Sequence, residues 1–378
     1  MIGKKKIFFN GLNELRAIAA FGVIVHHLEQ FKKLDGIKIF DTPFHYLVHS
    51  LGKSSVHLFF VLSGFLITYL LFQEKQNNGK IHIKKFYLRR IYRIWPLYYL
   101  IMFIGFIVIP YISNFDIFEN VANLCQVIEN ADNYSATNIA LYLGFLPQFA
   151  KPVLGVAQSW SIGIEEQFYL FIPLALHLLT KKWFLRLLIV TLICYSVATF
   201  FVHDYLSYKT IVYKIFKFFK IQYLTIGAIG GYLYFFHSEM IKKWTNSKYI
   251  YAILVVSIGY LMAVPVVGLK IQEFILAIGY MILILMTINS TNRLALRSKP
   301  LAYLGKISYG IYMYHPFMIF LVMPVVNKYV ENHVEGGVFY NLMLYIFTYI
   351  LTIIVSILSY RFIESKFIMI KDTKFKTI

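Results

Sequence analysis

The strongest constraint on this chain is a series of apolar runs, each about as long as a membrane-spanning helix. A helix needs about 20 apolar residues to cross the hydrocarbon core of a bilayer. Ten runs of this kind lie at 12–31, 47–73, 95–113, 159–180, 184–202, 215–236, 249–267, 271–289, 304–325 and 339–363. The sequence therefore predicts an all-α, polytopic membrane protein with about ten transmembrane helices. A shorter apolar stretch at 139–150 is expected to be re-entrant or interfacial.

The ten runs leave little room for a second domain. The chain has no internal repeat and no low-complexity linker, so we expect residues 1–378 to form one transmembrane domain without a separate soluble domain. Lys4, Lys5 and Lys6 before the first run resemble the start of a signal peptide. Glu14 and Arg16 interrupt that run, however, and a cleaved signal has an uninterrupted apolar core. We therefore expect a retained span.

Composition narrows the class of protein further. The formal net charge is +19, yet 59% of the residues are hydrophobic and only 15% are charged. Strong basicity often indicates a phosphate-rich partner. Here the basic residues lie mostly between long apolar runs, so we expect no nucleic-acid binding. Disorder is excluded by the high hydrophobicity, and a disulfide scaffold by the presence of only two cysteines.

The basic residues are distributed unequally between alternate loops, which sets the expected orientation. Residues 74–94 contain seven Lys and Arg, whereas residues 114–138 contain four acidic residues and no basic one. We therefore expect both termini and the basic loops in the cytoplasm, with 114–138 outside. The other basic residues expected on the cytoplasmic side are Lys181, Lys182, Arg186, Lys242, Lys243, Lys248, Arg293, Arg297, Lys299, Lys366, Lys371, Lys374 and Lys376. Those expected outside are Lys32, Lys33, Lys38, Lys151, Lys209, Lys270 and Lys328.

Burying an ionisable residue in a membrane costs free energy, so such residues inside the runs mark a functional site by default. The alternative is a polar pair that only holds two helices together. At 1.5 Å per residue, His27 lies ~22 Å and His315 ~16 Å from the cytoplasmic face. Glu165 lies ~21 Å from that face in a ~30 Å core, so His27 and Glu165 are predicted to share a layer. Pro316 is expected to break its helix and open a polar cavity. Two imidazoles and a carboxylate could perform general base chemistry.

Arginines form a second group of candidates. Arg90 and Arg93 share a helical face at the cytoplasmic mouth of the run 95–113. They are either positive-inside anchors or a phosphate site, since arginine makes bidentate contacts with phosphate. Arg16, ~6 Å inside the core, favours an anionic group that reaches inward from the cytoplasm.

A third candidate is the pair Ser63-Gly64 in an aromatic helix. Small residues usually permit close helix packing, and they could also let a ligand approach the backbone. Ser63 as a nucleophile is weakly supported, because no Gly-x-Ser-x-Gly elbow surrounds it.

Five motifs, in order along most of the chain, resemble the acyltransferase-3 family of bacterial integral-membrane O-acyltransferases. Two residues depart mildly from the family pattern: Ile162 replaces the usual Leu, and His57 stands where an acidic residue is frequent. The motifs are Arg16 and His27 separated by ten residues, and the segments 59–68, 90–96, 160–169 and 308–316.

The resemblance implies transfer of an acyl group, usually acetyl, from acyl-CoA to a hydroxyl of a cell-surface or lipid-linked glycan. It implies a bacterial cytoplasmic-membrane protein whose partners are acyl-CoA, a carbohydrate or lipid-linked acceptor and the bilayer, and we expect no metal. The oligomeric state stays open.

Together with the depth estimates, the resemblance suggests a role for each candidate residue. His27 would be the general base or a transient nucleophile, and Glu165 would orient it. His315 or Tyr309 would position the acceptor or polarise the carbonyl. Arg16, Arg90 and Arg93 would bind the phosphates of coenzyme A, and Ser63, Ser161 and Tyr309 would position substrate.

Two other functions compete with this one. An exporter of a glycan or small solute would also have intramembrane charges and broken helices, but the chain lacks a repeat and carries the acyltransferase motifs. A membrane sensor or scaffold with the same fold would not need Arg16, His27 and Glu165.

Overall fold

The computed structural model describes residues 9–39, 44–205, 215–216, 219–289, 296–330 and 333–375. Six of the basic residues used for orientation therefore cannot be placed in the fold. Lys4, Lys5, Lys6, Lys209, Arg293 and Lys376 lie outside the described residues.

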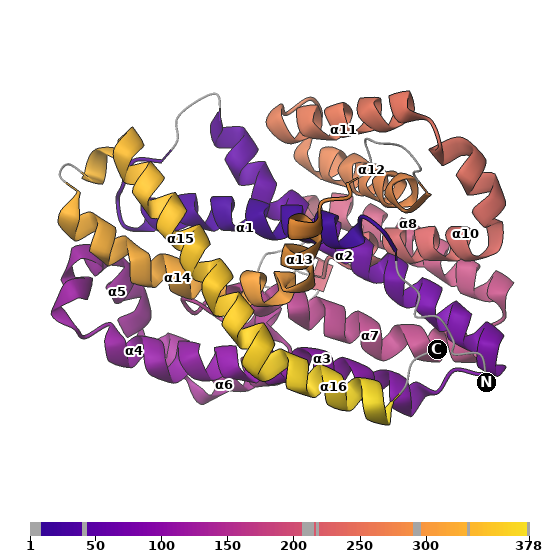
Figure 1. Cartoon of the computed structure of the whole chain (residues 1–378), viewed down its shortest axis with the longest axis horizontal. Helices are drawn as coiled ribbons and strands as arrows, with labels where there is room; N and C mark the ends of the chain where they lie inside the picture. Colours follow the sequence, from indigo (N-terminus) through magenta and orange to yellow (C-terminus); the bar gives the residue numbers. More distant parts are fainter. Residues whose placement is uncertain are drawn as a thin grey trace.

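Within these ranges every regular element is helical, which agrees with the predicted all-α class (Figure 1). Each of the ten expected spans overlaps one long helix. The long helices are α1 (Leu12–Leu34), α2 (Phe44–Asn78), α3 (Ile83–Phe103), α7 (Trp160–Leu178), α8 (Lys181–Tyr205), α10 (Ile221–Thr245), α11 (Lys248–Ala263), α12 (Leu269–Asn289), α14 (Ser308–Tyr329) and α15 (Val338–Ser359). The short α-helices are α4 (Ile109–Ile112), α5 (Ala122–Glu129), α6 (Ala136–Leu143), α13 (Lys299–Lys306) and α16 (Ser365–Lys374).

Length and hydropathy support membrane crossing for many of these helices. Among the described residues, 6 helices are long and apolar enough to span a bilayer, and α10 with α11, bent by 96° at their junction, would make 7. Helices α1 and α7 are not among them. Helix α1 carries Arg16 and α7 carries Glu165, and both of these charged side chains are partly buried within the bundle. The structure thus supports a multi-pass membrane protein.

One local expectation is confirmed and one is wrong. Helix α3 begins at Ile83, ahead of the apolar run 95–113, so Arg90 and Arg93 lie on one helix, as their spacing predicts. Helix α14 continues through Pro316 and Pro324 instead of breaking. A proline removes one backbone hydrogen bond from a helix, and in α14 neighbouring helices cover almost every residue around it, so packing holds the helix together.

The tightest contact between long helices joins α2 to α10. A Cβ atom added to Gly64 would collide with the backbone of Leu224, and one added to Gly227 would collide with the backbone of Val61. Small residues let two helix backbones approach in this way. The helix-packing interpretation of Gly64 is therefore confirmed, and the close approach fixes the height of Ser63 in the bundle.

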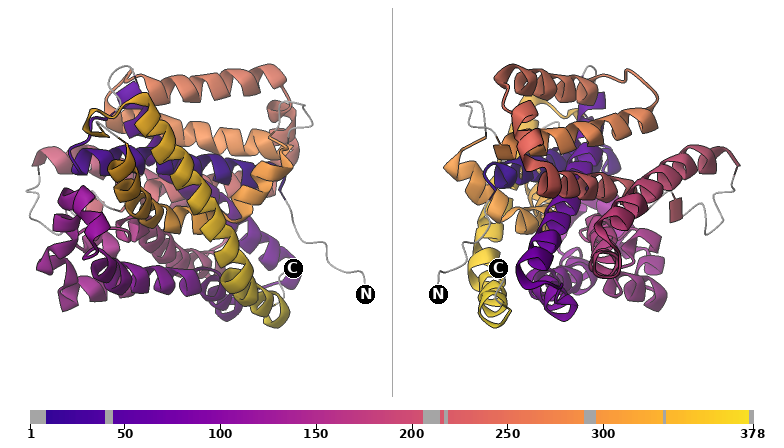
Figure 2. Two further views of the ribbon diagram at one scale, coloured as in Figure 1. Left: turned by 60° about the vertical axis from the view of Figure 1, so that its left-hand side comes forward. Right: turned by 90° about the vertical axis from the view of Figure 1, so that its right-hand side faces the viewer.

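Helix α1 forms the centre of the molecule and packs against α2, α13 and α14. Helices α15 and α16 form a long rod across one face, joined by a π-helical segment, Tyr360–Glu364 (Figures 1 and 2). Helices α11 and α12 lie side by side at another edge of the bundle (Figure 2). A second π-helical segment, Ile104–Val108, joins α3 to α4.

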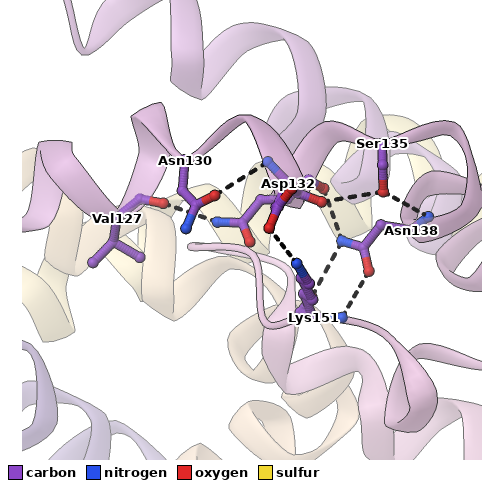
Figure 3. A network of polar contacts seen from close by, with 7 residues as sticks. Val127, Asn130, Asp132, Ser135, Asn138 and Lys151 are labelled. Atoms are coloured by element: carbon purple, nitrogen blue, oxygen red, sulfur yellow. Dashed lines mark hydrogen bonds and ion pairs between the residues drawn. The ribbon is translucent and has the colours of Figure 1, made fainter.

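The predicted outer loop folds into short helical pieces at one end of the bundle, around α5 and α6 (Figure 1). Asn138 lies at its centre and is buried. Its amide donates to the Asn133 carbonyl at 2.7 Å and accepts from the Lys151 backbone N–H at 2.7 Å (Figure 3). Asp132 pairs with the Lys151 ammonium at the surface. One buried amide thus links the two ends of this segment. The 3₁₀ segments among the described residues are Asp116–Val121, Ala131–Tyr134, Pro147–Phe149, Ala157–Ser159 and His333–Glu335.

We predict that Asn138→Leu destabilises the protein by about 1–3 kcal/mol, because the buried Asn133 carbonyl loses its partner. Thermal unfolding of the detergent-solubilised protein measures this. Asp132→Asn is the control, since an exposed ion pair contributes little. An equal loss of stability in the control would contradict the prediction.

The far end of α1 is anchored through Asp35, just beyond the helix. Its carboxylate accepts from the Asn327 amide of α14 at 3.3 Å and from the backbone of Asn123 and Leu124. Burial raises the pKa of Asp35 to about 6, although these hydrogen bonds oppose the rise. Folding therefore favours the protonated form of this carboxyl group.

This raised pKa predicts how stability depends on pH. Between pH ~4 and ~6 the unfolded chain loses the Asp35 proton before the folded protein does, so this group lowers stability as pH rises. Asp35→Asn removes the effect. We expect the melting temperature of the variant, relative to wild type, to increase between pH 4 and 6 and to level off above. A difference that stays constant, or slopes the other way, would count against it.

Candidate active site

Helix α1 presents two of the candidate residues on one face. Arg16 and His27 are separated by eleven positions, which is about three turns and ~16 Å along the axis. Their spacing therefore places the Arg16 cation near the start of the helix and the His27 imidazole in its second half, on the same side of the helix.

His27 is paired with His315 of α14. The Nδ1 atom of His27 lies 3.0 Å from Nε2 of His315 and 3.1 Å from the Val23 carbonyl oxygen. His315 is completely buried, and its Nδ1 lies 3.3 Å from the Ile311 carbonyl oxygen. The structure thus brings together two of the three predicted catalytic residues.

These contacts fix the proton positions of a neutral pair. A carbonyl can only accept, so Nδ1 of His315 carries a proton and donates it to Ile311. Nε2 of His315 is then an acceptor, and Nδ1 of His27 is the donor to it. The lone pair of His27 Nε2 remains, which is the arrangement that a general base requires.

Pro316 contributes to this pair in a way the sequence did not indicate. It has no N–H, so it leaves the Tyr312 carbonyl, four residues earlier, without its helical partner. The His315 side chain hydrogen-bonds the backbone at Tyr312 as well as at Ile311. The proline therefore frees an acceptor for the imidazole and does not open a gap.

Glu165 of α7 has different partners from those expected. Its carboxylate accepts from the Ser63 hydroxyl at 2.9 Å and from the Tyr169 hydroxyl at 3.0 Å. Arg16 and Arg90 are close enough to act on it electrostatically. The expected orientation of His27 by Glu165 is replaced by the contact with His315, and Glu165 instead organises the arginines and Ser63.

The arginines are held by aromatic and amide groups. The guanidinium carbon of Arg90 lies 5.4 Å from the ring centre of Tyr169 and 5.6 Å from that of Phe86. Its Nε atom is buried without a hydrogen-bond partner. Arg16 donates to the Asn13 side chain at 3.2 Å. Packing thus positions the charges while leaving donor capacity unused.

Ser161 and Tyr309, predicted to position substrate, fasten α14 to its neighbours. The Ser161 hydroxyl lies 2.7 Å from that of Tyr312, which donates to the Gln158 carbonyl at 2.8 Å. Tyr309 donates to the Ile94 carbonyl of α3 at 2.9 Å. Tyr312, one turn before His315, is a site residue that the sequence analysis did not select, although it lies within the quoted motif.

An inner cavity of about 140 Å³ connects these groups. Its polar lining comprises Arg16, Ser63, Arg90, Arg93, Ser161, Glu165, Tyr169, Lys306, Ser308, Tyr309 and Tyr312. Its lining extends to Tyr312 and Phe59, and the Tyr312 ring centre lies 5.9 Å from that of His315. All seven candidate residues other than His27 and His315 thus line one space, next to His315.

A wider vestibule of about 490 Å³ adjoins the inner cavity and shares Arg16, Arg90, Arg93 and Lys306 with it. It gains two further cations that the sequence analysis did not assign to a site. These are Arg89 of α3 and Lys371 of α16.

The charges of the vestibule are not balanced. Its two acidic residues are paired locally: Glu74 with Arg89 at 2.7 Å, and Asp372 with Lys371 at 3.2 Å. The other four cations, Arg16, Arg90, Arg93 and Lys306, form no ion pair with a carboxylate within the described part of the chain. Partly buried cations without counter-ions favour the binding of an anion. No group of three or more His, Cys, Asp and Glu in the described ranges could hold a metal ion.

Comparison with known proteins gives a consistent result. The profile of a family described as an acyltransferase domain matches residues 9–361. O-acetyltransferase OatA of Staphylococcus aureus (strain NCTC 8325 / PS 47) is 28% identical over 378 residues, covering 95% of this chain and 57% of that protein. A protein of S. aureus (strain COL), SACOL0978, whose name proposes an O-acetyltransferase, is 27% identical over 392 residues, covering 96% and 58%. The chain thus spans less than three-fifths of the length of these relatives. No solved structure is significantly similar.

We predict that pyrophosphate raises the melting temperature of the purified protein, because it supplies the missing negative charge and binds only the folded state. Sodium chloride at equal ionic strength should not reproduce the effect. Arg90→Gln should reduce the shift, whereas Lys328→Gln, an exposed cation at the other end of the bundle, should not. Equal shifts in both variants would show that the vestibule is not the binding site.

Proposed function

The chain belongs to the acyltransferase family whose profile it matches, and on this premise we propose that it moves an acyl group, acetyl in the expected case, from cytoplasmic acyl-CoA to a hydroxyl of a cell-surface or lipid-linked glycan at the outer side of the membrane. The observation that carries the proposal is the His27–His315 pair beside a cavity that opens from a cation-lined vestibule. The names of the relatives, O-acetyltransferases, support the type of reaction.

We further propose that all ten long helices cross the bacterial cytoplasmic membrane, with both termini in the cytoplasm. The overlap of each long helix with one apolar run supports this count. The excess of Lys and Arg in alternate loops supports the orientation. In this arrangement the vestibule opens to the cytoplasm, where acyl-CoA is found.

The vestibule fits the donor by charge. Arg16, Arg90, Arg93 and Lys306 lack carboxylate partners in the described structure, and the phosphates of coenzyme A would supply them. The planar guanidinium fork suits phosphate better than an ammonium does, and the buried Arg90 Nε has an unused N–H for the purpose. The pantetheine arm would then extend through the inner cavity towards Tyr312, which keeps the thioester near the histidines.

The proton assignment suggests the chemistry. His27 Nε2 removes the proton from the acceptor hydroxyl, and the hydroxyl oxygen attacks the thioester carbonyl. The carbon–sulfur bond breaks and an ester bond forms. The proton on His27 passes to the departing thiolate, which gives free coenzyme A. His315 accepts the Nδ1 proton of His27 in a hydrogen bond and stabilises its charged form.

The remaining candidates have supporting roles in this proposal. Glu165 holds Ser63 and acts on Arg16 and Arg90, so it would keep the donor site organised while the donor is bound. Ser161 fixes the Tyr312 hydroxyl at the inner end of the cavity. Membership of the acyltransferase family favours this function over the exporter.

We predict that His27→Ala lowers acyl transfer about 10²–10⁴-fold, the usual contribution of a general base. The assay uses protein in lipid nanodiscs with radiolabelled acetyl-CoA and sugar glycosides as acceptors. His315→Ala should lower kcat without raising the KM for acetyl-CoA. Arg90→Gln should raise the KM for acetyl-CoA without lowering kcat.

Tyr349→Phe is a matched control, because its hydroxyl bonds the Phe21 carbonyl on another face of α1. Full activity in a well-folded His27→Ala variant would remove His27 from the mechanism. Solute export without any acetyl-CoA consumption would favour the exporter.

A further inference from the structure

A second polar cavity lies at the opposite end of α1 from the vestibule. It has a volume of about 480 Å³, and its polar lining is His26, Glu29, Gln30 and Lys33 of α1 with His45 and His49 of α2. Arg16 and Lys33 are seventeen positions apart, or ~26 Å along the helix axis. The two cavities therefore open at different ends of the helix that carries His27.

This second cavity reaches the neighbourhood of the histidine pair. The ring centres of His26 and His27 are 5.3 Å apart, and those of His26 and His49 are 5.7 Å apart. His26 Nδ1 lies 3.3 Å from the Val48 carbonyl oxygen, and Gly52 leaves the space that the His26 ring occupies. A molecule in this cavity would therefore lie one side chain away from His27.

The charge of the cavity is positive. Its carboxylate, Glu29, is already neutralised: it accepts from the Lys32 ammonium at 3.0 Å and 3.1 Å and from the Tyr345 hydroxyl at 2.9 Å. Lys33 is exposed and forms no ion pair with a carboxylate within the described residues. An anionic group on a ligand would be attracted to Lys33, and the carboxylate in the described lining, Glu29, is already paired with Lys32.

The remaining lining suits hydroxyl groups. Imidazole and amide side chains both donate and accept hydrogen bonds, and the cavity presents three histidines and Gln30. A cavity of this size is within the range of small-molecule sites, about 300–1,000 Å³.

We propose that this cavity is the acceptor site and that the acceptor is a sugar bearing an anionic group, which Lys33 binds while the histidines and Gln30 bind its hydroxyls. The inference rests on the proposed function, because it identifies the substrate class of the same reaction. In this arrangement donor and acceptor approach His27 from opposite ends of α1, and neither has to pass the other.

Cysteine labelling tests the site without an acyl donor. Gln30→Cys is introduced in a Cys194→Ser background, since Cys194 is exposed and Cys125 is buried. The rate of maleimide labelling in nanodiscs is then measured in the presence of methyl β-D-glucuronide or methyl β-D-glucoside. The glucuronide carries a carboxylate where the glucoside carries a hydroxymethyl group. We expect the glucuronide to slow labelling several-fold more than the glucoside.

Adding Lys33→Gln should abolish the advantage of the glucuronide. Lys328→Gln is the control, because it removes the same charge beside Asn327, which bonds Asp35 close to the cavity. Equal protection by both sugars, no protection by either, or an advantage that survives Lys33→Gln would overturn the proposal.

The acetyl-transfer assay distinguishes this inference from the proposed function. Selective protection by the glucuronide without any transfer from acetyl-CoA would retain the sugar site and refute the acyltransferase. His27-dependent transfer to a glycoside without protection at Gln30→Cys would retain the acyltransferase and refute this site.

Discussion

The cost of removing polar groups from water determines how this protein is arranged. Helix α1 carries Arg16, His27, Glu29 and Lys32 in a chain that is otherwise strongly apolar. None of these side chains can face lipid at low cost, so each finds a partner inside the bundle: Asn13 for Arg16, His315 for His27, and Tyr345 and Lys32 for Glu29. A long helix rich in ionisable residues is thereby the central one, and the polar groups that it brings inside form part of the walls of two cavities.

Much of this organisation could be predicted from the sequence. Apolar runs locate helices because the bilayer sets their length, and every expected span overlaps a long helix of the structure. The candidate residues that the sequence indicates line one cavity, apart from the two histidines: Arg16, Ser63, Arg90, Arg93, Ser161, Glu165 and Tyr309. Charge and depth select Arg16 and Glu165, because a charged residue deep in an apolar run has few alternatives to the protein interior. Ser161 and Tyr309 come instead from the motifs that resemble the family.

What could not be predicted depends on the direction in which side chains point. A depth estimate gives a position along the membrane normal but not around the helix axis, so it placed Glu165 near His27 when Glu165 in fact faces Ser63 and Tyr169. Arg89, Arg90 and Arg93 lie ahead of the apolar run 95–113, and only the fold shows that they line a vestibule at this end of α3. Lys371 is expected only as a cytoplasmic charge, and Lys306 lies within the apolar run 304–325. Only the fold brings these two residues to Arg90.

The π-helical segment between α15 and α16 has a consequence for register. Such a segment accommodates one residue more than an α-helical turn does, and segments of this kind often occur at functional sites. Deleting one residue from Tyr360–Glu364 would rotate everything beyond it by about 100° about the helix axis. Lys371 would then turn away from the vestibule although the composition of the helix is almost unchanged. The rotation of α16 about its own axis, and not only its charge, therefore determines which of its side chains line the vestibule.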